Sequence, residues 1–299
     1  MIQRVLDFFK DQDVEIYRSF DISRISSIGI GGVADLAVYP NTEQQLLSVL
    51  AFLEENEIKY FIAGQMTNLL LCTDRYSGVI VLTDKMNGYC VAECGVRAEC
   101  GAKFSKALMG AADASVGGAE ALFGIPGSVG GMVYNNAGAF GKSVSDYFIS
   151  ARLYALKDKK VIRHFASDMN FGYRRSMLQS KEHVLLSAEF KLDKIDKEKI
   201  RNEFKRIISL RKGSQPYGEK SLGSIFKRCD GIPLSRLIDD LGLKGFRIGG
   251  AEISTKHAGF IVNSGGATAN DVLRLVEYVK NKIYKEYGII AEEEIELLK

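Results

Sequence analysis

The sequence contains no apolar run of about 20 residues, which is the length that a helix needs to cross a bilayer. Its first residues, MIQRVLDFFKDQ, hold no apolar stretch as long as the core of a signal peptide. No run of like charges forms a tail, and the net charge of +3 does not call for a nucleic-acid partner. These absences favour a cytoplasmic protein that neither enters membranes nor binds nucleic acid.

Histidine and cysteine are scarce, with three and five residues respectively. Cys90, Cys94 and Cys100 lack the paired close spacing of a zinc site and have no fourth ligand nearby. The histidines show no paired spacing either, so we expect no metal site. We expect the cysteines to be reduced and to serve in packing, with Cys90 and Cys94 on one strand.

Apolar periodicity divides the chain of 299 residues into helices and strands. The expected helices occupy residues 42–57, 102–114, 195–212, 233–243 and 267–288. The expected strands occupy residues 33–40, 59–64, 68–72, 78–83, 89–95, 149–156, 160–165, 184–192, 252–254, 259–263 and 289–298. This mixture predicts an α+β fold. We expect three domains, formed by residues 1–84, 85–212 and 213–299.

Several residues mark the ends of the expected helices. Thr42 suits the N-cap of the first helix, because its hydroxyl oxygen can accept a hydrogen bond from a backbone N–H group. Pro233 suits a first helical turn, where its missing N–H group is not needed. Thr268 and Asp271 have the spacing of a capping box, and Gly288 can end the helix that they start.

Residues 124–141 read GIPGSVGGMVYNNAGAFG, in which six of eighteen positions are glycine. Glycine lets backbone N–H groups turn inward and lets a ligand approach closely, so we interpret the run as a loop that cradles phosphates. Ser128 and Asn135 can add side-chain hydrogen bonds. The run is not a P-loop, because no Gly-Lys-Ser/Thr follows, and it lacks the context of the dinucleotide fingerprint. A plain surface turn, the alternative, needs fewer glycines.

A second turn, residues 64–68 (GQMTN), lies between two expected strands. It can offer N–H groups and the side chains of Thr67 and Asn68 to the same phosphates. Taken alone, this turn indicates little, and it gains meaning only beside the longer glycine-rich run.

Two polar sites in the middle of the chain have residue types suited to chemistry. Arg174, within the sequence YRRS, presents a planar fork to a carboxylate, although a solvated surface turn explains it equally well. Ser224 follows Gly223 at the start of a strand. No Gly-x-Ser-x-Gly elbow is present, so this serine is better suited to giving a proton than to attacking a carbonyl. An ordinary turn serine is the plainer alternative.

The terminal sequence EEEIE is a third candidate. If it is a strand, Glu292, Glu294 and Glu296 share one face, and such a face is usually solvated. One glutamate turned into a cleft would act as an acid, a base or a charge-stabilising group. His257 precedes an expected strand, and a lone histidine is more often structural than catalytic.

These motifs together resemble the UDP-N-acetylenolpyruvoylglucosamine reductase (UDP-N-acetylmuramate dehydrogenase) family, in its compact type II form. The matching stretches, in the family's order, are IGIGGVAD, GIPGSVGGMVYNNAGAFG, FGYRRSML, GSIFKR, KHAGFIVN and EEEIELL. They cover nearly the whole chain. The probability that GIPGSVGG, NAGA, YRRS and GSIFKR occur together by chance is very small.

The resemblance implies a fold and an activity. Two N-terminal domains would form the FAD-binding unit of the vanillyl-alcohol-oxidase/PCMH type, and a C-terminal α+β domain would bind the substrate. NADPH would reduce the flavin, which would then reduce the UDP-sugar enolpyruvyl ether to UDP-N-acetylmuramate for peptidoglycan synthesis. The resemblance further implies a cytoplasmic enzyme, and we expect a monomer or weak dimer.

The resemblance also implies residue roles. Arg174 and Glu294 would hold the carboxylate region of the substrate, and Ser224 would protonate the carbanion. The residues implied in cofactor binding are Gly64, Gln65, Met66, Thr67, Asn68, Gly124, Ile125, Pro126, Gly127, Ser128, Gly130, Gly131, Asn135 and Gly138. The residues implied in substrate binding are Tyr173, Lys212, Arg228, His257 and Asn263.

Two positions depart from the family pattern. The upstream motif is usually Gly-x-Gly-Ser-Asn, and here Met66 takes the place of the second glycine. Ser214 stands where the family commonly has lysine, although Lys212 is close. These departures leave room for a flavin-binding paralogue that is non-catalytic or has another substrate. A sugar or lactone oxidase of the same fold is a further alternative, but it would often tether FAD through a histidine or cysteine, and neither occurs from Gly64 to Leu71.

Overall fold

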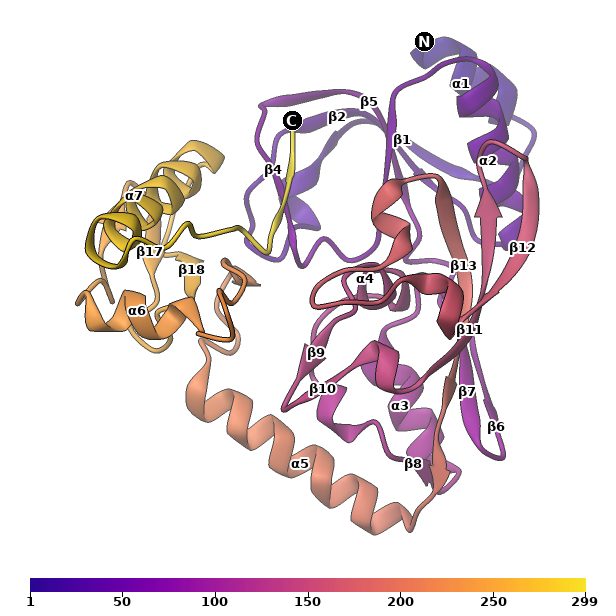
Figure 1. Ribbon diagram of the computed structural model, residues 1–299. Helices are drawn as coiled ribbons and strands as arrows, with labels where there is room; N and C mark the ends of the chain where they lie inside the picture. The colour runs from indigo at the N-terminus through magenta and orange to yellow at the C-terminus, as the bar shows by residue number, and fades with distance from the viewer. The chain divides into compact units, whose positions relative to one another are not determined.

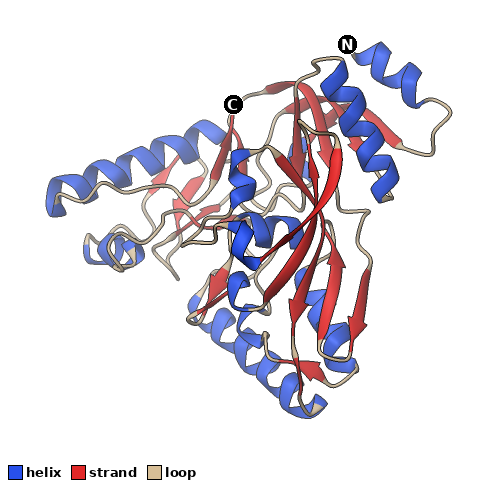
Figure 2. Cartoon of the chain, turned by 45° about the vertical axis from the view of Figure 1, so that its right-hand side comes forward, coloured by secondary structure: helices blue, strands red, loops and turns tan.

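The computed structural model describes residues 1–299 and shows strands and helices interspersed along the chain (Figure 1, Figure 2). They form two compact units. Unit 1 contains residues 1–18, 35–65 and 77–209, and unit 2 contains residues 19–34, 66–76 and 210–299. The α+β class expected from the sequence is confirmed. The division into three domains at residues 84 and 212 stays a prediction.

The N-terminal sheet has the strand order β1-β2-β5-β3, with β3 and β5 parallel. Its strands are β1 (Glu15–Asp21), β2 (Val33–Tyr39), β3 (Tyr60–Ala63) and β5 (Arg75–Leu82). Helices α1 (Ile2–Phe9) and α2 (Glu43–Glu55) belong to the same part of the chain. Thr42 caps α2 as expected, because its Oγ1 accepts a hydrogen bond of 3.2 Å from the Gln45 N–H group.

The second sheet is antiparallel, with the order β12-β11-β13-β7-β6. Its strands are β6 (Tyr89–Ala92), β7 (Gly95–Glu99), β11 (Phe148–Ala155), β12 (Lys160–Phe165) and β13 (His183–Lys191). Unit 1 also contains helices α3 (Phe104–Asp113) and α4 (Val129–Tyr134). Two short antiparallel strand pairs complete it: β8 (Val116–Gly117) pairs with β14 (Asp193–Lys194), and β9 (Gly138–Ala139) pairs with β10 (Lys142–Ser143). Short 3-10 helices are η1 (Ile22–Arg24), η2 (Glu120–Leu122), η3 (Val144–Asp146), η4 (Ala166–Met169) and η5 (Met177–Ser180).

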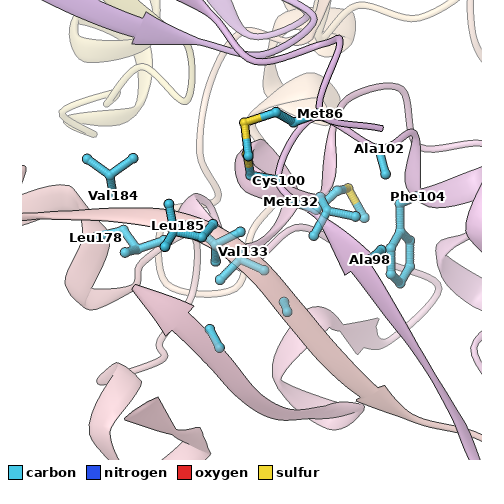
Figure 3. Close-up of a cluster of buried hydrophobic side chains, with 14 of the residues drawn as sticks. Met86, Ala98, Cys100, Ala102, Phe104, Met132, Val133, Leu178, Val184 and Leu185 are labelled. Carbon is cyan, nitrogen blue, oxygen red and sulfur yellow. The ribbon is translucent and has the colours of Figure 1, made fainter. Parts of the chain in front are cut away.

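Helices α3 and α4 belong to the same core as this sheet. Figure 3 shows Met132 and Val133 of α4 near Leu185 of β13, together with Cys100 and Phe104. All five side chains are nearly or fully buried. Burial of such apolar side chains contributes about 1.5–3 kcal/mol each. The glycine-rich run is therefore fixed to unit 1 through the apolar residues that separate its glycines.

The cysteine-containing strand expected at residues 89–95 is instead a hairpin, which corrects the sequence analysis. Strand β6 ends at Ala92, and β7 begins at Gly95. Cys94 therefore lies in the turn, and both Cys90 and Cys94 are exposed rather than packed. Cys100 is buried, as expected of a packing residue, and all five cysteines are free thiols.

Unit 2 is built around a four-stranded antiparallel sheet with the order β15-β18-β17-β16. Its strands are β15 (Ser221–Ser224), β16 (Arg247–Ile248), β17 (Ala251–Ile253) and β18 (Phe260–Asn263), and its helices are α6 (Leu234–Asp240) and α7 (Ala269–Tyr287). Helix α5 (Lys197–Ser214) contains the boundary between the two units. No helix combines the length and the apolar character needed to cross a membrane.

The ends of α7 follow the expected local rules. Thr268 and Asp271 form the capping box, and Gly288 ends the helix in the left-handed conformation with φ +68°. Pro233 is the N-cap of α6, one position before the first turn that we expected.

The final strand is shorter than expected. Strand β19 covers only Glu296–Leu298 and pairs in parallel with β4 (Leu69–Leu71). Residues 289–295 are not regular strand, so the alternation of the acidic side chains does not extend along a sheet. The expectation of a strand from residue 289 was wrong, because specific contacts rather than a ladder hold this segment.

Candidate functional site

The glycine-rich run is not a loop throughout, which corrects the sequence analysis. Helix α4 occupies its centre, and Ser128 is the N-cap, accepting a hydrogen bond of 3.3 Å from the Gly131 N–H group. Two glycines in six residues gave α4 a low helix propensity, so the pattern indicated a loop. The buried side chains of Val129, Met132 and Val133 stabilise the helix in spite of this.

The N–H groups at the start of α4 are bound within the protein. Val129 N–H donates to the Ala102 carbonyl at 2.8 Å, and Gly130 N–H donates to the Cys100 carbonyl at 2.7 Å. With the bond from Gly131 to the cap, three successive donors are therefore used. These three groups are therefore not part of an anion nest, and the assignment of Gly130 and Gly131 to the cofactor stays a prediction.

Gly64 and Ser128 bring the two expected cofactor loops into contact. A Cβ atom on Gly64 would lie 2.2 Å from Ser128 Oγ, a separation that no side chain tolerates. Gly124 and Gly127 have φ values of +77° and +131°, which residues with side chains rarely adopt. The packing at Gly64 and the backbone conformation at Gly124 and Gly127 thus favour glycine.

Met66 occupies the position at which the family pattern has glycine. Its φ is +47°, so the backbone keeps the left-handed conformation that glycine favours. The side chain is buried, and the Met66 carbonyl accepts hydrogen bonds from both the N–H group and the hydroxyl of Ser27. Met66 therefore adopts a turn conformation that glycine would also adopt.

Tyr173 and Arg174 form the tip of a tight turn in unit 1. Gly172 and Arg175 exchange two backbone hydrogen bonds of 3.0 and 3.2 Å at its base. Arg174 has φ +53°, and its guanidinium carbon lies 5.1 Å from the centre of the Tyr173 ring. The tip thus presents an aromatic ring and a cation together.

This turn is fastened to the glycine-rich run. Arg174 Nη2 donates to the Gly138 carbonyl at 3.3 Å, and Ser176 Oγ donates to the Tyr134 carbonyl at 2.8 Å. Asn136 Nδ2 donates to the Gly172 carbonyl at 2.9 Å. The sequence analysis selected Asn135 and missed Asn136, because the pair NN gives no local signal of which amide reaches a distant carbonyl.

Ser224 and Glu294 are neighbours in unit 2. Ser224 ends β15 opposite Phe260, and its Oγ donates to the Phe226 carbonyl at 3.3 Å. The N–H group of Glu294 donates to the Ile225 carbonyl at 2.7 Å. This backbone hydrogen bond places Glu294 opposite the residue that follows Ser224.

Asn68 joins the same group. Its side-chain Nδ2 donates to the Glu294 carbonyl at 3.0 Å, and the backbone carbonyl of Asn68 accepts from the Glu296 N–H group at 2.9 Å. The side-chain amide of Asn68 thus donates to a carbonyl of the protein, whereas we had expected it to donate to phosphates.

The expected substrate residues of unit 2 differ in how firmly they are held. His257 Nδ1 accepts from the Gly259 N–H group at 3.1 Å, and the Gly259 carbonyl accepts from the Ile225 N–H group at 2.9 Å, one residue from Ser224. Burial lowers the pKa of His257, so the neutral ring is favoured. Asn263 Nδ2 donates to the Ile28 carbonyl at 3.0 Å.

Lys212 and Arg228 are exposed cations. The Lys212 ammonium lies 5.5 Å from the centre of the Tyr217 ring, and the Lys212 carbonyl accepts a hydrogen bond from Lys256 Nζ. An exposed ammonium beside an exposed aromatic ring suits an anionic ligand with a planar base. No group of three or more His, Cys, Asp or Glu side chains is placed to hold a metal ion.

The three consecutive glutamates near the end of the chain have different environments. Glu292 is largely exposed and pairs with Lys227 at 3.3 Å, while Glu293 pairs with Lys280 at 2.9 Å where both side chains are more than two-thirds buried. Glu294 lies between these pairs and β19. Ion pairs therefore hold Glu292 and Glu293, the two residues before Glu294, and the run is not a solvated acidic face.

Comparison with known protein families identifies both parts of the chain. The family described as FAD binding domain matches residues 34–163. The family described as UDP-N-acetylenolpyruvoylglucosamine reductase, C-terminal domain, matches residues 215–298. The first match contains both loops that we assigned to the cofactor, and the second contains Ser224 and Glu294. The chain carries an FAD-binding domain.

Individual relatives match along nearly their whole length. UDP-N-acetylenolpyruvoylglucosamine reductase of Caldicellulosiruptor bescii is 36% identical over 296 residues, which are 97% of this chain and 93% of that protein. The enzyme of the same name from Streptococcus thermophilus is 38% identical, with 98% and 97% covered. The crystal structure of the Thermus caldophilus reductase superposes with a TM-score of 0.80 at 31% identity, covering 96% of this chain and 99% of that one. The chain therefore belongs to the UDP-N-acetylenolpyruvoylglucosamine reductase family.

Proposed function

We propose that this chain uses NADPH and FAD to reduce UDP-N-acetylglucosamine enolpyruvate to UDP-N-acetylmuramate, a step of peptidoglycan synthesis. The observation that carries the proposal is the hydrogen bond from the Glu294 N–H group to the Ile225 carbonyl, which places Glu294 opposite the residue after Ser224. A proton donor and a carboxyl group at neighbouring positions suit a reaction that ends in protonation of a carbon atom.

The substrate chemistry assigns a task to each residue. Bound FAD supplies the hydride, which it receives from NADPH. Hydride addition to the terminal carbon of the enol ether places negative charge on the adjacent carbon and its carboxylate. We assign the stabilisation of this charge to Arg174, whose guanidinium can hold a carboxylate through two hydrogen bonds.

Ser224 delivers the proton in this proposal. Its hydrogen bond to the Phe226 carbonyl is long, at 3.3 Å, so the hydroxyl can turn to another acceptor at small cost. Glu294 would bind the carboxylate region in its protonated form or paired with arginine. Its backbone N–H group is tied to the carbonyl of Ile225, the residue after Ser224, which holds the two chain segments side by side.

The proposed cofactor site lies in unit 1. There the backbone of residues 124–128 and of Gly64 would hold FAD, at turns whose conformation or close packing favours glycine. Tyr173, Lys212, Arg228 and His257 are the proposed contacts to the nucleotide sugar. We further propose a cytoplasmic enzyme that acts as a monomer or weak dimer.

A two-stage reaction tests the proposal. Purified protein should be yellow, and NADPH should bleach the flavin under anaerobic conditions. Addition of the enolpyruvyl substrate should restore the colour and yield one UDP-N-acetylmuramate per flavin. A flavin that NADPH reduces but that this substrate never reoxidises would refute the substrate assignment and would favour a flavin-binding paralogue with another role.

A further inference from the structure

We propose that Asn68 is a positioning residue that sets the place of Glu294 beside Ser224, an inference that rests on the proposed function. Asn68 lies in the 64–68 turn, whose sequence pattern points to the cofactor. The structure gives its side chain a second partner, because Nδ2 donates to the Glu294 carbonyl at 3.0 Å across 226 residues of chain.

The first argument is the register of β4 and β19. Their parallel pairing begins at Leu69 and Glu296, and the Glu296 N–H group donates to the Asn68 carbonyl at 2.9 Å. Glu294 lies just before this ladder, and its carbonyl accepts its hydrogen bond from the side-chain amide of Asn68. The amide thus extends the pairing of the two segments by one step with a side-chain donor.

The second argument is that both backbone polar groups of Glu294 are held. Its N–H group donates to the Ile225 carbonyl at 2.7 Å, and its carbonyl accepts from Asn68. One contact fixes the distance to the strand that ends at Ser224, and the other fixes the rotation of the peptide. Removal of the Asn68 donor leaves only one of these two backbone constraints on Glu294.

The third argument is the choice of side chain. Asparagine carries a donor and an acceptor on a short stem, whereas aspartate of nearly the same shape has only acceptors when it is ionised. A carbonyl partner therefore distinguishes the two residues. Asparagine and aspartate at position 68 thus differ in hydrogen-bonding capacity rather than in shape, so the pH dependence of Asn68→Asp tests the contact.

The experiment compares Asn68→Ala and Asn68→Asp with wild type, each as FAD-loaded protein, in the two half-reactions measured separately. For Asn68→Ala we expect reoxidation by substrate to slow by about tenfold more than reduction by NADPH, which is the order of one lost hydrogen bond. Asn281→Ala is the matched control, because Asn281 is an exposed asparagine on α7 that bonds only to Glu277.

The pH dependence of Asn68→Asp gives a signature that a general loss of stability would not give. The protonated acid can donate to the Glu294 carbonyl, and the carboxylate repels it. The ratio of its reoxidation rate to that of wild type should therefore rise as the pH is lowered through the titration of the new carboxyl group. A ratio that does not change with pH would overturn the inference.

The outcomes separate this inference from the proposed function. If wild type is not reoxidised by the substrate, the proposed function fails. If wild type is reoxidised and Asn68→Ala behaves the same, only the role of Asn68 fails. If Asn68→Ala and Asn68→Asp both release FAD or slow the two half-reactions equally, the side chain serves the cofactor or the fold, and the inference is again overturned.

Discussion

The side-chain amide of Asn136 donates to the backbone carbonyl of Gly172 at 2.9 Å, at the base of the turn that carries Arg174. Its Oδ1 accepts from the Ser145 N–H group at 2.9 Å, so both ends of the amide are used. Asn136 is buried and has φ +39°. One side chain thus connects the glycine-rich run to the turn of the proposed carboxylate-binding residue.

Replacement of Asn136 by Ala should affect stability and the second half-reaction together. Two part-buried backbone groups lose their partner, which costs about 1–2 kcal/mol in total because water can partly replace the lost bonds. The turn that carries Arg174 also loses a support. Urea unfolding and the rate of reoxidation measure the two effects, and Asn87→Ala provides an exposed asparagine as control. Unchanged reoxidation would show that the turn is held without this amide.

Replacement of Ser224 by Ala should separate the two half-reactions. The reduction of the flavin by NADPH does not require a proton from Ser224, so its rate should stay close to that of wild type. Reoxidation by the substrate should slow by about 100-fold or more, which is the usual contribution of a positioned proton donor. Stopped-flow absorbance follows both steps. Equal losses in the two steps would contradict the proton-donor role.

The two lysine–glutamate pairs near Glu294 should differ in strength. Lys227→Met breaks a pair in which Glu292 is 72% exposed, and we expect a change in the free energy of unfolding below about 0.5 kcal/mol. Lys280→Met breaks the pair with Glu293, whose side chains are 29% and 27% exposed, and should cost about 1 kcal/mol or more. Urea unfolding of both variants under the same conditions measures the difference. Equal values would show that burial does not strengthen the pair.

Met66→Gly sets two effects against each other. Glycine would relieve the left-handed conformation, which costs a residue with a side chain about 1 kcal/mol. It would also remove a side chain that is only 4% exposed, and the loss of a buried methionine costs about 2–5 kcal/mol. We expect a net destabilisation of about 2 kcal/mol in urea unfolding of the FAD-loaded protein. A more stable variant would show that backbone strain exceeds burial at this position.

His183 should make the protein less stable in mild acid. Burial, and then the neighbouring His164 ring at 5.6 Å, lowers the pKa of His183 below its unfolded value. The folded state thus favours the neutral ring, and this stability is present above about pH 6.5 and is lost as the pH falls through the folded pKa. Urea unfolding of wild type and His183→Gln at pH 7.5 and 5.5 tests it. The wild type should lose more stability than the variant.

Local signals in the sequence predicted the elements whose causes are local. Thr42, Thr268 and Gly288 act on the helix beside them, so their roles could be predicted from neighbours in the chain. Helix α4 was missed because its glycines oppose helix formation and its support comes from core packing. The cysteine hairpin was missed because alternation alone does not reveal a turn.

The candidate site shows the same division. Arg174, Ser224 and Glu294 could be selected by residue type and by family resemblance, and their roles remain predictions. Asn136 could not be selected, and the second partner of Asn68 could not be foreseen. Their partners, Gly172 and Glu294, are 36 and 226 residues away, and nothing in the local pattern encodes such pairs.

The parallel pairing of β4 with β19 has a consequence for the order of folding during synthesis. The ribosome makes Leu69–Leu71 long before it makes Glu296–Leu298, so β4 has no strand partner while most of the chain is translated. Contacts of such long sequence separation form slowly, because the intervening chain must first be ordered. A nascent chain can therefore build the glycine-rich part of the site early, yet it has no fixed Glu294 until its last residues have joined β4.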